Sequence, residues 1–263
     1  MGTDAWSPTE IAKRIETVGI AKARADLVSV LTLSVLAGAF ISLGGLFFTV
    51  VISGSNLGFG MTRLVGGLAF SLGLILVVVA GAELFTGNNL VAMAWASKRI
   101  SSRDLFRNWG LVYLGNVFGA LATVGLVVLA GSDQLGGGIV GQKALAIARA
   151  KAELPVSEAL ALGIGCNALV CLAVWLAFGG RSVTDKVLAI VFPITAFVTV
   201  GFEHSIANWF FLPWAMALGA EDLALGAAQN LALVTIGNVI GGTVLVAGVY
   251  WLAYLRPGRP DGL

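Results

Sequence analysis

The sequence is poor in charged residues. Asp, Glu, Lys and Arg make up 11% of its 263 residues, whereas a water-soluble domain carries roughly a quarter. One histidine and two cysteines are present, and they do not complete a metal-ligand set. We therefore expect no metal and no cofactor. Without paired carboxylates at catalytic spacing, the chain is not expected to be an enzyme.

The N-terminus also lacks a secretory signal, because its first 25 residues hold no short apolar run before a small-residue cleavage site. Basic residues are not gathered on one binding face, so we expect no nucleic-acid partner.

What the sequence has is apolar length. Hydrophobic residues make up 58% of the chain and the mean hydropathy is +0.93. Six apolar stretches can each supply the roughly 20 residues that cross a lipid bilayer. They are residues 27–52, 64–96, 105–130, 159–178, 187–218 and 223–254. The runs do not alternate with period two, which argues against a β-barrel. The sequence thus predicts an all-α integral membrane protein with six transmembrane helices.

The distribution of Lys and Arg predicts the orientation, because cytoplasmic loops carry an excess of both. With a cytoplasmic N-terminus, twelve of the 16 fall inside, and the outer four are Arg63, Lys143, Arg149 and Lys151. We therefore expect both termini in the cytoplasm and the protein in the inner (cytoplasmic) membrane.

Three segments follow from this pattern. Residues 1–26 are predicted to form a cytoplasmic amphipathic helix, residues 27–255 the six-span channel domain and residues 256–263 a cytoplasmic tail. Ser7, Pro8 and Glu10 form a helix start with a capping box. The apolar face of Ile11, Ile15 and Val18 predicts a helix on the membrane surface; a simple solvated helix is the alternative.

Two of the apolar stretches are too long for one straight helix. The second and the fifth run for about 33 residues, which is roughly 50 Å of helix across a hydrocarbon core of about 30 Å. Each has polar residues inside it, "AELFTGNNL" from Ala82 and "FEHSIAN" from Phe202. We expect both helices to be broken, which membranes tolerate where protein or a water-lined cavity satisfies the backbone.

An internal repeat relates the two halves. Glu83 and Asn88 are five residues apart, as are Glu203 and Asn208, and each pair precedes a Gly-Asn-Val-x-Gly motif by about thirty residues. Three spans per repeat would invert the second copy relative to the first. The sequence therefore predicts the inverted-repeat architecture of transporters, with a site where the repeats meet.

Candidate functional residues lie at the breaks. His204 can change charge near neutral pH and is a pore candidate; the alternative is a histidine bonded within a helix interface. Thr86 offers a hydroxyl that could face His204 or cap the following half-helix. Glu83 and Glu203 are expected to accept freed backbone N–H groups, a role we favour over proton transfer.

Four asparagines, Asn88, Asn116, Asn208 and Asn238, are expected to bridge loop backbone at these breaks. The two cysteines, Cys166 and Cys171, lie about 140° apart on a helix, so they cannot pair with each other and are interpreted as packing residues.

Four segments resemble the signatures of the formate/nitrite transporter family. They are "ELFTGNN", "LGNVFG", "CNALVCLAVWLAFGGRSVTDK" and "GFEHSIANWFFLP", in the family's order. The resemblance extends from Ile11 to Tyr254. It implies an aquaporin-like fold with broken second and fifth helices, and a homopentamer in which each protomer has its own pore.

The resemblance also implies site residues. It makes His204 the central histidine, Thr86 the facing threonine, Asn167 a polar pore residue and Lys151 a vestibule lysine that draws in anions. The implied apolar constrictions are Phe70 and Phe197 on the outer side and Leu74, Leu84, Phe85 and Val170 on the inner side.

The implied substrates are small monovalent anions of weak acids. "GRSVTDK" with "GFEHSIANWFFLP" resembles the formate branch, so we expect formate transport with a proton supplied at His204. Nitrite or hydrosulfide is the alternative, and acetate and lactate belong to the same class. The other classes of function are a membrane enzyme and a scaffold subunit without a pore, and the polar residues at the breaks favour a pore.

Overall fold

The computed structural model describes residues 5–257, and these fold into helices with no β-strand among them. The predicted tail beyond residue 257, with Arg259, and residues 1–4 lie outside this range. The α-helices in chain order are α1 (Pro8–Arg24), α2 (Leu27–Ile52), α3 (Phe59–Ala80), α4 (Ala92–Ala96), α5 (Ser102–Leu129), α6 (Ile139–Ala152), α7 (Val156–Gly179), α8 (Val183–Val200), α9 (Ser205–Ala217), α10 (Ala224–Ile240) and α11 (Val249–Tyr254).

Shorter helical segments join these. Three are 3-10 turns, η1 (Gly87–Val91), η2 (Ser132–Gln134) and η3 (Glu221–Leu223), and η4 (Gly241–Gly248) is a π-helix between α10 and α11. Six segments are long and apolar enough to cross a membrane: α2, α3, α5, α7, α8 and the run Glu221–Tyr254. The prediction of six transmembrane helices is confirmed.

Both predicted helix breaks are present. The second apolar stretch divides into α3 and the short η1 and α4, and the fifth divides into α8 and α9. Gly81 and Gly201 end the first halves with φ of 84° and 91°. This left-handed conformation suits glycine, which has no Cβ to clash with the following carbonyl.

Glycine also allows the spanning helices to approach closely. A Cβ on Gly119 would overlap the carbonyl oxygen of Val35, which brings α5 against α2. A Cβ on Gly241 would overlap the carbonyl oxygen of Ile164, which brings η4 against α7. Small residues at such contacts let helix backbones pack without a hydrophobic driving force, as lipid surroundings require.

The N-terminal helix α1 packs against η1, α4 and α7. Its predicted capping box is confirmed, with Ser7 and Glu10 bonding reciprocally. Ile11 and Ile15 are buried in a cluster with residues of α4 and α7, so the prediction that this face lies on the membrane surface is wrong. The protein itself covers this face, because α1 packs against η1, α4 and α7 and its isoleucines join Met93 and Trp175 in one apolar cluster.

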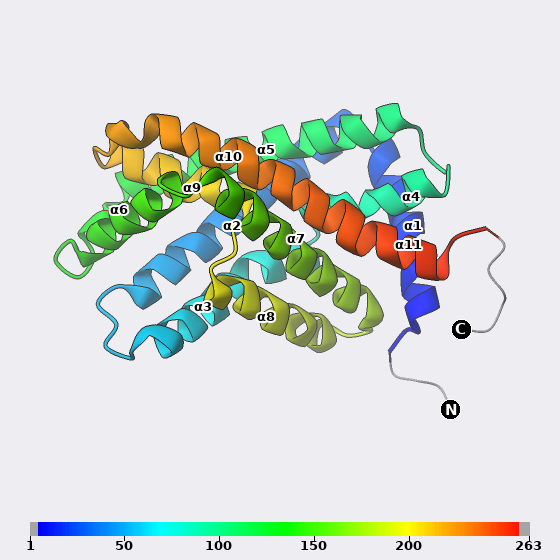
Figure 1. Cartoon of the computed structure of the whole chain (residues 1–263), viewed down its shortest axis with the longest axis horizontal. Coiled ribbons are helices and arrows are strands. Elements are labelled where there is room, and N and C mark those ends of the chain that lie inside the picture. Colours follow the sequence, from blue (N-terminus) through cyan, green and yellow to red (C-terminus); the bar gives the residue numbers. More distant parts are fainter. Residues whose placement is uncertain (1–4, 258–263) are drawn as a thin grey trace.

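Figure 1 places α1, α4 and α11 at one end of the molecule and α6 at the opposite end. Neither α6 nor η4 was predicted from the sequence. Helix α6 lies between the third and fourth spans and is followed closely by α7.

Candidate functional site

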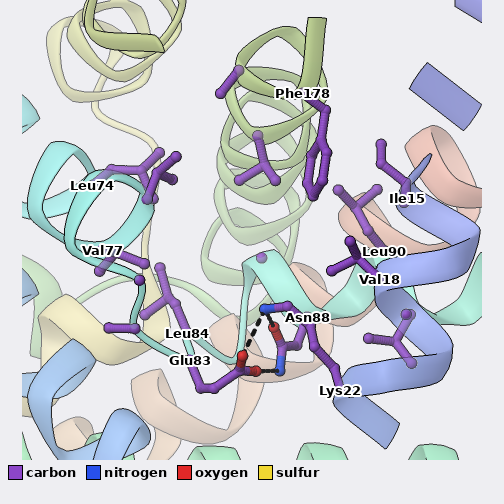
Figure 2. Close-up of a pocket in the computed structure, with 18 of the residues that line it drawn as sticks. Ile15, Val18, Lys22, Leu74, Val77, Glu83, Leu84, Asn88, Leu90 and Phe178 are labelled. Carbon is purple, nitrogen blue, oxygen red and sulfur yellow. Dashed lines mark hydrogen bonds and ion pairs between the residues drawn. The ribbon is translucent and has the colours of Figure 1, made fainter. Parts of the chain in front are cut away.

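One cavity lies beside α1. It has a volume of about 360 Å³ and is bounded by α1, α3, η1 and α7. Figure 2 shows Leu74, Val77 and Leu84 on one side facing Ile15, Val18, Leu90 and Phe178 on the other, with Lys22, Glu83 and Asn88 bonded together at one end. We refer to it as the α1 cavity. Its walls are largely apolar, and Arg14 and Lys186 also line it apart from that cluster.

A second cavity lies beside α6. It has a volume of about 410 Å³ and is lined by Phe70 and Phe197 as well as His204. Three cations also line it, Arg63, Lys143 and Lys151. We refer to it as the α6 cavity. Each cavity is lined by three cations and one carboxylate, and His204 lines the α6 cavity.

Thr86 and His204 meet in the protein interior. The Thr86 Oγ1 and His204 Nε2 atoms are 3.0 Å apart, and both side chains are buried. Thr86 belongs to the break after α3 and His204 to the break before α9, so the two helix breaks bring together residues 118 positions apart. The prediction that Thr86 faces His204 agrees with this contact. Thr86 makes no cap bond, so the capping alternative is wrong.

The hydrogen bonds of His204 determine which ring nitrogen carries the proton. The backbone N–H of Ala207 donates to His204 Nδ1 at 3.1 Å, which makes the imidazole the N-cap of α9. Nδ1 must therefore be unprotonated, and the neutral ring carries its proton on Nε2. That proton points to the Thr86 oxygen, which leaves the Thr86 hydroxyl proton available to another acceptor.

A partly buried polar cluster supports the break after α3. Lys22 on α1 lies 3.0 Å from Glu83 and donates to Asn88 Oδ1 at 2.8 Å. Asn88 Nδ2 donates to Glu83 at 2.6 Å and to Asn108 Oδ1 at 3.0 Å. Asn108 closes the ring by donating to the carbonyl of Lys22.

A second cluster supports the break before α9. Lys151 on α6 lies 2.8 Å from Glu203, and Asn208 Nδ2 donates to Glu203 and to Asn230 Oδ1, both at 2.7 Å. Asn230 donates to the carbonyl of Lys151. The two clusters match position by position. The corresponding pairs are Lys22 and Lys151, Glu83 and Glu203, Asn88 and Asn208, and Asn108 and Asn230. The same bonding pattern therefore occurs at both breaks, and it includes a lysine from α1 at the first and from α6 at the second.

Asn116 and Asn238 hold the backbone at the two breaks. Asn116 accepts from Phe85 N and donates to the carbonyls of Ser34 and Glu83. Asn238 accepts from Ser205 N and donates to the carbonyls of Gly163 and Glu203. The expected bridging role of these two asparagines is confirmed.

The glutamates and the other two asparagines act differently from our expectation. Glu83 and Glu203 accept from lysine and asparagine side chains instead of from freed backbone N–H groups. Likewise, the side chains of Asn88 and Asn208 bond to other side chains. The backbone carbonyl of Asn88 accepts from Trp109 Nε1. The reason is that the amides of Asn116 and Asn238 already occupy the freed backbone groups.

The predicted constriction residues are all buried, but they lie in different places. Phe70 and Phe197 meet edge to face with ring centroids 5.6 Å apart at the α6 cavity. Leu74 and Leu84 line the α1 cavity. Phe85 packs against Tyr113, with centroids 4.9 Å apart, and Val170 joins the main core cluster. Neither of these last two lines a cavity described above.

Asn167 is fully buried and bonded within the protein. Its Nδ2 donates to Asn89 Oδ1 and to the carbonyl of Asn238, both at 2.7 Å. The Cys171 thiol donates to the carbonyl of Thr86 at 3.3 Å. Asn167 and Cys171 therefore hold the loop that carries Thr86, a contribution of Cys171 that the sequence did not reveal.

Sequence reasoning also missed Lys22, Asn108 and Asn230. A signal was present, since residues 108–116 and 230–238 both read N-x-x-L-V-x-x-G-N. Within residues 5–257, no group of three or more His, Cys, Asp or Glu side chains is placed to hold a metal ion.

Comparison with known proteins gives consistent matches along the chain. The family model described as formate/nitrite transporter matches residues 9–252. The formate channel FocA of Escherichia coli K12 is 42% identical over 275 residues, covering 96% of each chain. A probable formate transporter of Methanothermobacter thermautotrophicus is 39% identical and covers 97% of this chain and 100% of its own length.

Two solved structures show the same fold. A pentameric formate channel with formate bound superposes with a TM-score of 0.79 at 42% identity, over 88% of this chain and 98% of that one. A channel described as an FNT family ion channel gives a TM-score of 0.84 at 30% identity, over 93% and 99%.

Proposed function

The chain belongs to the formate/nitrite transporter family, and from this premise we propose that it carries formate across the cytoplasmic membrane through a pore in each protomer, with a proton supplied at His204. The observation that carries the proposal is the Thr86–His204 contact. The pair lies at the two helix breaks, and His204 lines the α6 cavity beside the apolar side chains of Phe70 and Phe197.

Formate is the favoured substrate because the relatives at 42% and 39% identity, and the superposed pentameric channel, are named for it. Nitrite and hydrosulfide remain the alternative, since they are small monovalent anions of weak acids too. Acetate and lactate are larger, and the close approach of Phe70 and Phe197 disfavours them.

The proposed path runs from the α6 cavity past Phe70 and Phe197 to His204 and Thr86, then past Leu74 and Leu84 into the α1 cavity. All these side chains are buried, so the path is closed at its centre in this conformation. An anion that enters such a dry region loses solvation worth several kcal/mol. Its neutral acid loses much less, which is the physical reason for lending the anion a proton near the constriction.

The geometry sets a condition on the proton transfer. In the neutral ring Nε2 already carries the proton and Nδ1 accepts from Ala207 N. A second proton must therefore arrive at Nδ1, which breaks the cap bond to Ala207. The resulting imidazolium can pass its Nε2 proton to formate, directly or through the Thr86 hydroxyl, and formic acid leaves. The ring is then neutral with its proton on Nδ1. The starting tautomer and the cap bond to Ala207 return only when Nδ1 releases that proton to water and Nε2 takes up another.

Orientation and assembly are part of the proposal. We place both termini in the cytoplasm, because the Lys and Arg residues then follow the positive-inside rule, so the α1 cavity opens to the cytoplasm. We also propose a homopentamer, as in the superposed channel. Large apolar side chains stand exposed on the protomer, such as Phe118 and Leu129 on α5, and lipid or neighbouring subunits would cover them.

The test is formate flux into proteoliposomes of the purified protein, measured against protein-free vesicles of the same lipid. Labelled formate uptake above the protein-free rate is expected, and excess unlabelled formate should compete better than nitrite or hydrosulfide. No uptake above the protein-free rate while nitrite or hydrosulfide permeates would transfer the assignment to that anion.

A further inference from the structure

The basic residue that draws anions into the α6 cavity is expected, by resemblance, to be Lys151. In the structure its ammonium is 2.8 Å from Glu203 Oε1, and the two side chains are 14% and 8% exposed. Asn208 and the carbonyl of Lys151 itself complete that cluster. A buried ion pair of this kind has no net charge, so the attraction for an incoming anion must come largely from other groups.

Two other cations line the same cavity. They are Arg63, at the start of α3, and Lys143 on α6. Within residues 5–257 neither forms an ion pair, and Glu203 is the one carboxylate among the residues described as lining this cavity. The uncompensated positive charge at this mouth therefore belongs to Arg63 and Lys143.

Arg63 is held in place by the end of α8. Its Nε donates to the carbonyl of Thr199 at 2.9 Å and its Nη2 donates to the carbonyl of Val198 at 3.0 Å. These carbonyls are at the C-terminus of α8, where the helix dipole is negative and a cation is favoured. They also directly follow Phe197, one of the two rings at the constriction.

The guanidinium keeps donors for a ligand. It carries five N–H groups in a planar fork, and the two bonds to α8 leave three of them. A carboxylate can take two parallel bonds from such a fork. A side chain fixed on one edge and open on the other is preorganised for this, because little further ordering is needed when the ligand binds.

We propose that Arg63, assisted by Lys143, is the anion-capture site of the α6 cavity and binds the carboxylate of formate before it passes Phe70 and Phe197. This inference rests on the proposed function and names a residue for its first step. Because Arg63 lies beside the constriction, its field also lowers the energy of the anion inside that constriction.

The experiment measures initial formate permeability of proteoliposomes at low formate, with no imposed pH gradient, at ionic strengths of roughly 0.01 and 0.5 M. The screening length falls from about 30 Å to a few ångström over this range. The variants are Arg63→Gln, Arg63→Lys, Lys143→Gln and, as the matched control, Arg149→Gln. Arg149 is on the same helix as Lys143, pairs with Asp222 and does not line the cavity. Size-exclusion profiles confirm that each variant assembles.

We expect Arg63→Gln to lower permeability about tenfold at low ionic strength and about twofold at high, since focused charge raises capture by at least that order. Arg63→Lys should recover most of the loss, Lys143→Gln should show a smaller loss with the same salt dependence, and Arg149→Gln should match the native protein. Equal, salt-independent losses in Arg63→Gln and Arg63→Lys would mean that Arg63 only fastens α8. Native permeability in Arg63→Gln would overturn the proposal as well.

The two proposals fail in different ways. If the native protein shows no formate flux above protein-free vesicles, the formate assignment fails, and the same series is run with nitrite because capture requires only a small anion. A salt-dependent loss of nitrite permeability in Arg63→Gln keeps the capture site, and the absence of such a loss removes it.

Discussion

Replacing His204 by asparagine or by glutamine tests separately the two hydrogen bonds that its imidazole makes, with Ala207 N and with the Thr86 hydroxyl. Asparagine can place an acceptor near the position of Nδ1 and keep the cap on Ala207, but it has no group at the position of Nε2. Glutamine can reach Thr86 with an amide N–H but loses the cap. Each substitution removes one hydrogen bond, worth about 1 kcal/mol, from a fold whose total stability is of order 5–15 kcal/mol. We expect both variants to fold.

The effect on transport should be far larger than the effect on stability. Neither amide can accept and release a proton, so formate would have to cross the constriction as the anion. If this costs about 3 kcal/mol of lost solvation, the flux falls roughly a hundredfold. The ratio of protons to formate should fall from about one in the native protein to near zero in both variants.

The assay combines two readings on the same proteoliposomes. Labelled formate reports uptake, and a pH dye inside the vesicles reports protons, since formic acid that enters dissociates and acidifies the interior. Outside pH is varied from 5 to 8, which changes the neutral fraction of a carboxylic acid about tenfold per unit. Native protein should acidify the interior faster as the outside pH falls. One proton per formate in His204→Asn, with native pH dependence, would refute proton transfer at His204.

Three further predictions concern the supporting structure. Glu203→Gln leaves the Lys151 ammonium buried without its partner and should destabilise the purified protein by about 3 kcal/mol. In thermal unfolding, the double variant Glu203→Gln/Lys151→Met should recover most of the lost stability. An unchanged unfolding temperature in Glu203→Gln alone would contradict the prediction. Asn238→Ala removes the acceptor for Ser205 N and two carbonyl bonds, which should cost at least 1–3 kcal/mol in the same assay; equal stability would show that water replaces the amide. Gly119→Ala should cost about 1–3 kcal/mol of stability by overpacking against Val35. Gly125→Ala on the same helix is the control and should be neutral or stabilising, because a Cβ there meets no atom within 4 Å. Similar yields and unfolding temperatures for the two variants would argue against the close α2–α5 contact.

Much of the fold was readable from the sequence, because a lipid environment imposes strong constraints on it. A helix must satisfy its own backbone and needs about 20 apolar residues to span a bilayer. Six such stretches therefore predicted six spans, and two stretches of excessive length predicted two breaks. The capping box at Ser7 was equally local, since its partners are three residues apart.

The sequence predicted the two helix breaks, but it predicted only some of the side chains that bond to the freed backbone groups there. Glutamates beside a break are plausible acceptors for freed N–H groups, and the sequence alone could not show that Asn116 and Asn238 take those groups first. Nor could it show that α1 packs against η1, α4 and α7, because an amphipathic face has the same pattern whether lipid or protein covers it.

By itself, the sequence determined the class of protein, the number of spans, the positions of the two breaks and the residues placed in them. The tertiary structure alone decided which of these residues meet. Thr86 and His204 are 118 positions apart, Lys22 and Glu83 are 61 apart, and Lys151 and Glu203 are 52 apart. Local pattern cannot encode such distances, since they depend on how helices pack. That packing makes Lys151 half of an ion pair, whereas Arg63 forms no ion pair within residues 5–257.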